Sequence, residues 1–213
     1  MIINYVDYYS IETHSITLEL GHMNYLVLVL LSLPLMGDDA AKKKFEATKL
    51  LAESGIAFSQ NYLGLMYNQG IGVSLDLKEA AKWYRKAAEQ GNAYAQYNMG
   101  VSYEQGQGVP QDSKEAFKWY LKAAEQGDAD AQNNLGYMFK LGNGVLQDYK
   151  EAVKWYLKAA KQGNSFAQFN LALMYDNGEG VPEDNKEAVR WYRLAAEQGD
   201  EDAQYNLAIS YDY

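Results

Sequence analysis

The stretch from Lys114 to Gly136 reads KEAFKWYLKAAEQGDADAQNNLG, and variants of this line occur three more times in the chain. KEAAKWYRKAAEQGNAYAQYNMG begins 36 residues earlier, at Lys78, and KEAVKWYLKAAKQGNSFAQFNLA begins 36 residues later, at Lys150. The last copy, KEAVRWYRLAAEQGDEDAQYNLA, begins at Lys186. Internal repetition with a period of about 20 to 50 residues is typical of solenoids and propellers. The pattern inside one copy has to separate these two architectures.

Each copy begins with a tryptophan-containing segment that predicts an amphipathic helix. In the copy that begins at Lys78, apolar residues recur at helical spacing and therefore share one face. They are Ala80, Ala81, Trp83, Tyr84, Ala87 and Ala88. Another helix is predicted over about residues 93–105, with a core stripe of Ala95, Met99 and Tyr103. Because no alternating β-branched run interrupts the copies, the pattern excludes a propeller.

The tryptophan-containing helix has recognisable ends. An aspartate stands three residues before a glutamate in every copy, as Asp112 does before Glu115, and this spacing predicts a capping box. Both carboxylates then lie at the positive end of the helix dipole, so we interpret the pair as a cap and not as a catalytic acid and base. Gly127 and its equivalents follow the last turn, where glycine ends a helix in the left-handed conformation. The G-x-G at 106–108 follows a helix instead of a strand, so it predicts a turn and not a phosphate loop.

A single helix pair cannot bury the apolar stripes of both its helices. Stacked pairs bury a continuous core, so each copy is the hydrophobic partner of the next. Gly100 and Gly136 keep one helix face small, which lets a neighbouring helix approach closely. The predicted anchors of the core are Trp83, Trp119, Trp155 and Trp191.

The combined pattern resembles the Sel-1-like repeats, which are relatives of the tetratricopeptide repeat. The residues that carry the resemblance are A-x-x-x-L-G-x-x-Y-x-x-G-x-G-V-x-x-D followed by K-A-x-x-W-Y-x-x-A-A-x-x-G, from about Gly55 to the C-terminus. The chain departs from the pattern at three positions: Ser59 replaces an alanine, and Ser74 and Leu146 replace the proline of the loop. The resemblance implies an all-α fold, a right-handed α-solenoid of stacked antiparallel helix pairs with a 36-residue repeat. In this family the helix equivalent to 93–105 is the first of each pair, and the tryptophan-containing helix is the second.

The resemblance assigns residues 38–213 to the solenoid, with about four full repeats. A degenerate helix over about 38–54 and a lone helix from about Glu201 flank these repeats. The lone helix is expected either to cap the stack or to mark a truncation.

The N-terminal segment 1–37 differs from the repeats, because it has no Lys or Arg and contains the apolar run YLVLVLLSLPLM. This run is shorter than the roughly 20 residues of a membrane-spanning helix. Residues 23–37 have the length of a signal-peptide core followed by small residues, although positive charge is missing before it. We therefore expect a protein that is exported to the periplasm or secreted, and that has no stable membrane span. The alternative is a cytoplasmic protein whose N-terminal segment packs on the first repeat.

The composition argues against several classes of function. The net charge is -9, and an acidic protein repels phosphate backbones, so no nucleic-acid partner is expected. The chain has no Cys, and its two histidines, His14 and His22, precede the repeats. No H-E-x-x-H, G-x-S-x-G or P-loop pattern occurs. We therefore expect no enzymatic activity, no cofactor and no metal site.

The resemblance implies a scaffold or adaptor that binds a peptide or protein segment in the concave groove, which the first helix of each pair lines. The predicted contact residues are Tyr94, Tyr97, Asn98, Asn134, Tyr137, Phe166, Phe169, Asn170, Tyr205 and Asn206. Amides carry donors and acceptors, so the asparagines can hold an extended backbone, as in related tetratricopeptide grooves. Alternatively, each asparagine bonds to the neighbouring helix. Aspartates such as Asp130 favour a neutral or basic partner over an acidic one.

A second function class stays open, which is a structural protein that self-associates through its lone last helix. A monomer whose mass does not depend on concentration favours the adaptor. We expect the chain to be a monomer or to self-associate weakly.

Overall fold

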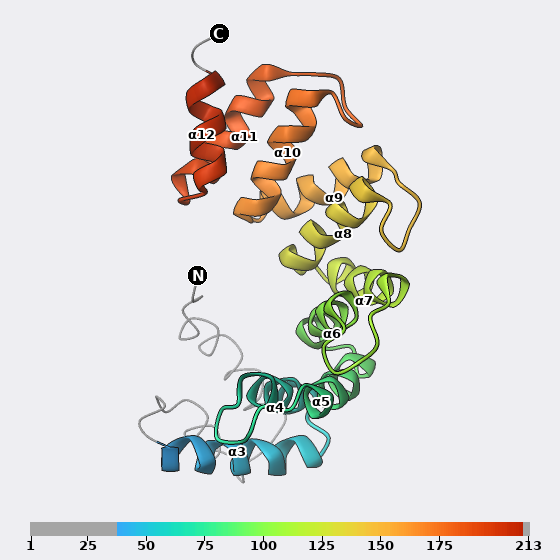
Figure 1. The fold of residues 1–213 in the computed structure, drawn as a ribbon, viewed down its shortest axis with the longest axis vertical. Coiled ribbons are helices and arrows are strands. Elements are labelled where there is room, and N and C mark those ends of the chain that lie inside the picture. Colours follow the sequence, from blue (N-terminus) through green and yellow to red (C-terminus); the bar gives the residue numbers. More distant parts are fainter. Residues whose placement is uncertain (1–37, 211–213) are drawn as a thin grey trace. The chain divides into compact units, whose positions relative to one another are not determined.

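The computed structural model describes residues 38–210, which form ten helices and no strand (Figure 1). The helices are α3 Asp38–Glu53, α4 Ala57–Gln69, α5 Leu77–Glu89, α6 Ala93–Gln105, α7 Ser113–Glu125, α8 Ala129–Leu141, α9 Tyr149–Lys161, α10 Ser165–Asn177, α11 Asn185–Glu197 and α12 Glu201–Ser210. Helices α4, α6, α8 and α10 are the first members of four pairs, and α5, α7, α9 and α11 are the second members. The all-α repeat solenoid predicted from the sequence is confirmed.

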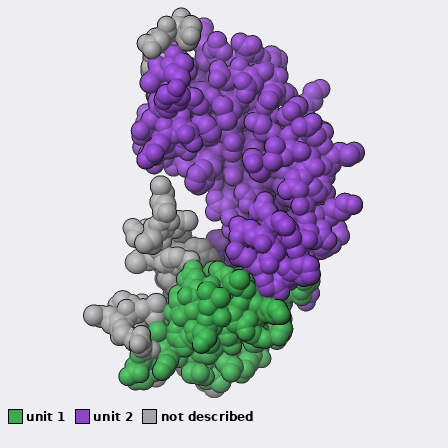
Figure 2. Space-filling model, viewed as in Figure 1, with its two compact units in different colours: residues 1–87 green, residues 88–213 purple. Residues whose placement is uncertain are grey.

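The chain divides into two compact units, residues 1–87 and 88–213 (Figure 2). In unit 1, side chains of α3 and α4 form the core, among them Phe45, Leu63 and Met66. Unit 2 contains α6 to α12, and its core continues from one helix pair to the next. The predicted signal-like segment 1–37, its apolar run at 23–37 and the predicted export lie outside the described residues.

The aspartate cap of the second helices is confirmed, but the predicted capping box is wrong in its return bond. Oδ1 of Asp112 accepts from the backbone N–H of Lys114 at 2.9 Å and of Glu115 at 3.1 Å. The backbone N–H of Asp112 already donates to the carbonyl of Tyr103 in the preceding helix, at 2.9 Å. Glu115 therefore pairs with Lys118 on the next turn instead. The same arrangement recurs at Asp76, Asp148 and Asp184.

The glycine-rich turn is confirmed, and one of its glycines also serves the stacking of the repeats. Gly142 ends α8 with φ 71°, and Gly144 follows with φ 73°, so both lie in the left-handed region. A Cβ added to Gly144 would overlap the backbone carbonyl of Ser113, which begins α7. The turn after α8 therefore packs against the start of the second helix of the preceding pair.

Small residues on the first helix receive a tyrosine ring from the second helix of the same pair. A Cβ added to Gly136 would lie 2.5 Å from Cδ1 of Tyr156, and Gly100 meets the Tyr120 ring in the same way. Both tyrosines are fully buried. The predicted close approach is therefore confirmed, and the side chain that requires it is the tyrosine that follows each tryptophan.

The tryptophans of unit 2 are buried, as predicted, with a cation over each ring. Nζ of Lys122 lies 4.2 Å from the ring centroid of Trp119, and Nζ of Lys158 lies 3.7 Å from that of Trp155. In unit 1, Trp83 is only half-buried and packs at the edge of the core. The tryptophan therefore closes the core beneath a charged surface, whereas the tyrosine lies inside it.

In unit 2, a buried glutamine in each of α6, α8 and α10 connects consecutive repeats, and we did not predict its role from the sequence. Nε2 of Gln132 donates to the carbonyl of Ala124 at 3.1 Å, near the end of α7. Its Oε1 accepts from Nε2 of Gln162 at 2.8 Å, just after α9. Gln132 therefore joins the ends of two successive second helices. Equivalent bonds are made by Gln96 and Gln168.

We expect the Gly136→Ala variant to be less stable than the parent by about 1–3 kcal/mol, because the added methyl group overlaps the buried Tyr156 ring. By helix propensity alone, alanine at this position would stabilise the chain by about 1 kcal/mol relative to glycine. A net loss of stability would therefore come from the overlap with the Tyr156 ring. Urea denaturation followed by circular dichroism measures this difference. In the background of Tyr156→Leu, which leaves room for the methyl group, the same change should be less destabilising. Equal or higher stability of Gly136→Ala alone would contradict the close contact.

Candidate protein-binding face

The predicted contact residues all lie on the first helices of unit 2 and on α12, which occupies the same place in the repeat. They are Tyr94, Tyr97 and Asn98 in α6, Asn134 and Tyr137 in α8, Phe166, Phe169 and Asn170 in α10, and Tyr205 and Asn206 in α12. We call the surface that these residues form the first-helix face. On each helix the helical period turns them away from the fully buried positions of the core stripe.

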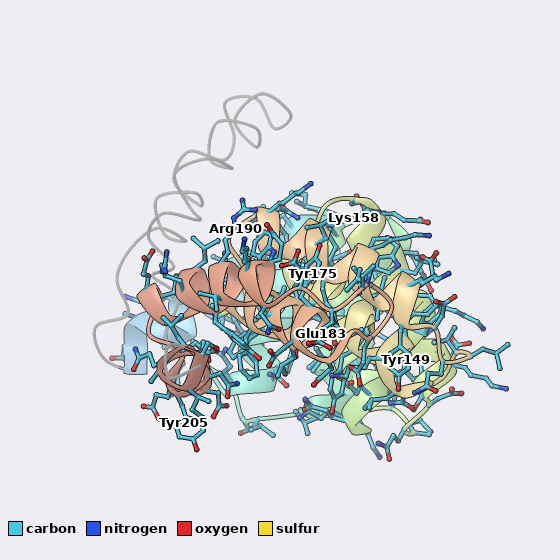
Figure 3. The ribbon with its side chains drawn as sticks, turned by 90° about the horizontal axis from the view of Figure 1, so that it is seen from above. Tyr149, Lys158, Tyr175, Glu183, Arg190 and Tyr205 are labelled. Carbon is cyan, nitrogen blue, oxygen red and sulfur yellow. The ribbon has the colours of Figure 1, made fainter. Side chains whose placement is uncertain are left out.

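Large aromatic side chains are exposed on every helix of the first-helix face. The exposed fraction is 40% for Tyr94, 48% for Tyr137, 63% for Phe166 and 68% for Tyr205. In Figure 3, Tyr205 points outward from α12, on the opposite side of the unit from Lys158 and Arg190 of the second helices. Tyr205 and these two cations, which lie over tryptophan rings, therefore face different directions.

Two further aromatic residues of the face are half-buried and rest on the tyrosines of the second helices. The ring centroids of Tyr97 and Tyr120 are 5.7 Å apart, and those of Phe169 and Tyr192 are 5.9 Å apart. Such tilted aromatic contacts favour one ring orientation. The buried tyrosines Tyr120 and Tyr192 therefore hold the rings of Tyr97 and Phe169 in place on the first-helix face.

The asparagines in the middle of the face bond to one another and to the tyrosines. Nδ2 of Asn133 donates to Oδ1 of Asn134 at 3.4 Å, and Nδ2 of Asn170 donates to Oδ1 of Asn133 at 3.1 Å. Asn134 also reaches the hydroxyls of Tyr97 and Tyr120. For Asn134 and Asn170 the structure thus supports bonds to neighbouring helices. Our predicted contact residues omitted Asn133, which connects them.

Carboxylates lie among the tyrosine hydroxyls of the face. Burial raises the pKa of Tyr97 to about 12, with smaller contributions from the negative charges of Asp130, Asp128 and Glu104. The hydroxyl of Tyr120 donates to Oε2 of Glu104 at 2.8 Å. The electrostatic potential around Tyr97 is therefore negative.

Within residues 38–210, no three histidine or acidic side chains gather in a way that could hold a metal ion. In the same part of the chain, no helix combines the length and the apolar character that crossing a membrane requires. The chemical groups that the face presents are aromatic rings, amides, hydroxyls and carboxylates. These groups bind other molecules through stacking and hydrogen bonds.

The repeats match the family model described as Sel1 repeat at residues 57–92, 93–128, 129–164, 165–200 and 201–213. The chain therefore belongs to the Sel1 repeat family, as its sequence pattern predicted. Sel1 repeat proteins are generally scaffolds without enzymatic activity that bind other proteins. No curated protein sequence matches the chain.

Several solved structures share the fold. A Sel1 repeat protein from Oxalobacter formigenes is 44% identical with a TM-score of 0.74, over 80% of this chain and 72% of that one. The protein c5321, a protective antigen of uropathogenic Escherichia coli strains with an SLR fold, is 38% identical with a TM-score of 0.78. That match covers 85% of this chain but only 39% of the antigen. The cysteine-rich protein B of Helicobacter pylori is 26% identical with a TM-score of 0.51, over 62% of this chain and 96% of that one.

The raised pKa of Tyr97 predicts a loss of stability in alkaline solution. The pKa of Tyr97 is about 12 in the folded chain and about 10 in an unfolded one, so the unfolded chain loses this proton at a lower pH. The contribution of Tyr97 to the free energy of unfolding is therefore complete below pH 10 and is lost as the pH rises towards 12. Between about pH 9 and about pH 11, the parent should lose about 1 kcal/mol more than the Tyr97→Phe variant. Urea denaturation at the two pH values measures this difference. Tyr94→Phe, at an exposed ring, is the control, and identical losses in the parent and Tyr97→Phe would refute the assignment.

Proposed function

We propose that the first-helix face of unit 2 binds a segment of another protein in an extended conformation. The row of exposed aromatic side chains along α6, α8, α10 and α12 supports this proposal most directly. A monomeric protein seldom exposes several large aromatic side chains on one surface without a binding role. Tyrosine and phenylalanine also lose little conformational freedom on binding, because their rings turn about only two bonds.

The spacing of the aromatic side chains favours an elongated ligand over a compact one. Tyr94 and Phe166 occupy the same position in helices that are two repeats apart. A ligand that contacts both has to cross α8 between them, where Tyr137 is also exposed. An extended segment meets this requirement with few residues, since each adds about 3.3 Å of length.

The charge of the face favours a neutral or basic segment. Asp130 and Glu104 act on the hydroxyl of Tyr97, and Asp176 accepts from the hydroxyl of Tyr192 at 3.3 Å. A lysine or arginine of the segment would be attracted to these carboxylates, and an acidic segment would be repelled. We expect micromolar affinity, on the order of -8 kcal/mol.

Self-association through α12 is the second candidate function. Ala172 of α10 is completely buried, whereas its equivalent in α12, Ala208, is exposed. Because Leu207 beside it is only half-buried, α12 presents apolar surface that a helix of a second copy could cover. Light scattering over a range of concentrations separates the two candidates, since a constant monomer mass contradicts self-association.

The test of the proposed face is the double variant Tyr94→Ala/Phe166→Ala, assayed with the partner identified by pull-down and mass spectrometry. Both rings are exposed, so the fold should persist while affinity falls at least about tenfold, or about 1.4 kcal/mol. The matched control is Lys118→Ala/Lys154→Ala on the exposed surface of the second helices. Loss of binding only in the lysine variant would place the partner on the second helices and refute the proposal.

A further inference from the structure

The buried tyrosine hydroxyls of unit 2 are not equivalent. The hydroxyl of Tyr120 donates to Glu104 at 2.8 Å, and that of Tyr192 donates to Asp176 at 3.3 Å. The hydroxyl of Tyr156 is equally buried, yet it has no hydrogen-bond partner within the described residues 38–210. A buried donor without a partner destabilises a protein and is uncommon in folded chains.

The exception follows from one change of residue in the first helix. Glu104 and Asp176 accept a hydrogen bond from the tyrosine hydroxyl, and Lys140 occupies the equivalent position in α8. A lysine ammonium group only donates hydrogen bonds, so Lys140 cannot accept from Tyr156. Its Nζ lies 3.4 Å from Oε2 of Glu179 in the turn after α10.

The surroundings of the Tyr156 hydroxyl connect it to the first-helix face. Burial is the main cause that raises the pKa of the Tyr156 hydroxyl. Electrostatic interactions with Tyr137 and Glu179 raise this pKa further. Tyr137 is 48% exposed, so its side chain can turn without opening the core. The equivalent residues, Val101 and Leu173, carry no hydroxyl. The Tyr156 ring also packs against Gly136, the residue that precedes Tyr137 in α8, so the tyrosine whose hydroxyl has no partner packs on a helix of the binding face.

We propose that the Tyr156 hydroxyl donates a hydrogen bond to a carbonyl oxygen of the bound protein segment, which reaches it when Tyr137 turns aside. This inference rests on the proposed function and names the point at which the segment is fixed. Asn134 and Asn170 already bond to neighbouring side chains. In contrast, Tyr156 has a donor that no described residue uses. The carbonyl belongs either to the main chain of the segment or to an asparagine or glutamine side chain.

The first part of the test compares two tyrosine-to-phenylalanine variants of the full chain without a ligand. Tyr156→Phe should unfold at the same urea concentration as the parent or at a higher one, because no hydrogen bond is lost. Tyr120→Phe should unfold at a lower concentration, because Glu104 loses its donor. Equal destabilisation by the two variants would show that Tyr156 has a partner in the free protein, and would overturn the inference.

The second part measures binding of dodecapeptides selected on the parent chain from a random phage-displayed library. Tyr156→Phe should weaken binding about tenfold, as expected for a lost hydrogen bond in a desolvated site. Tyr149→Phe, at an exposed ring of α9, is the control and should bind like the parent. If Tyr94→Ala/Phe166→Ala weakens binding and Tyr156→Phe does not, the proposed face stands and this inference fails. If neither variant weakens binding, or if no peptide is selected, the proposed face fails as well.

The third part identifies the source of the carbonyl oxygen. Each asparagine or glutamine of a selected peptide is replaced by alanine, and binding to the parent is compared with binding to Tyr156→Phe. If one replacement removes the difference between the two chains, the side chain supplies the carbonyl. If the difference persists through all replacements, the main chain supplies it. Either result supports the hydrogen bond.

Discussion

The contact between a tyrosine ring and a small residue of the facing helix determines the geometry of each repeat in unit 2. Gly136 allows the Tyr156 ring to lie where a Cβ would otherwise be, and Gly100 does the same for Tyr120. The ring thereby reaches through the pair, and its hydroxyl ends among the polar residues of the first helices. Packing and function are therefore linked, because the side chain that fills the core also supplies a polar group of the candidate binding face.

The regular contacts of the repeat leave the surface of the first helices free to vary. Caps, glycine turns and the glutamine bonds recur from pair to pair, although the residues at positions 137 and 140 differ from their equivalents in the preceding repeat. Those positions hold Tyr137 and Lys140, whereas the preceding repeat holds Val101 and Glu104. The residues at these two positions of the surface that we propose for binding therefore differ from one repeat to the next. Repeat proteins commonly combine a constant core with a variable binding surface in this way.

The sequence predicted the helices, the turns and the core tryptophans of unit 2 because those features depend on local spacing that recurs at a fixed period. It did not predict interactions between residues far apart in the chain. The return bond from Glu115 to the cap is replaced because Asp112 already donates to Tyr103 in the preceding helix. Gln132 contacts Gln162 thirty residues away, and the Asn133 bridge joins two repeats. For the binding face, the sequence predicted only which residues belong to it. The hydrogen bonds of these residues and the charges around them depend on neighbours that are distant in the sequence.

The most direct test of the account is hydroxyl-radical footprinting of the chain with and without its captured partner. Oxidation is read at exposed aromatic side chains by mass spectrometry, so each residue reports its own contact with solvent. We predict that binding protects Tyr94, Tyr137 and Phe166 and leaves Tyr149, which is exposed on second helix α9, unchanged. Protection of Tyr149 with continued oxidation of the other three would place the partner on the second helices and contradict the account.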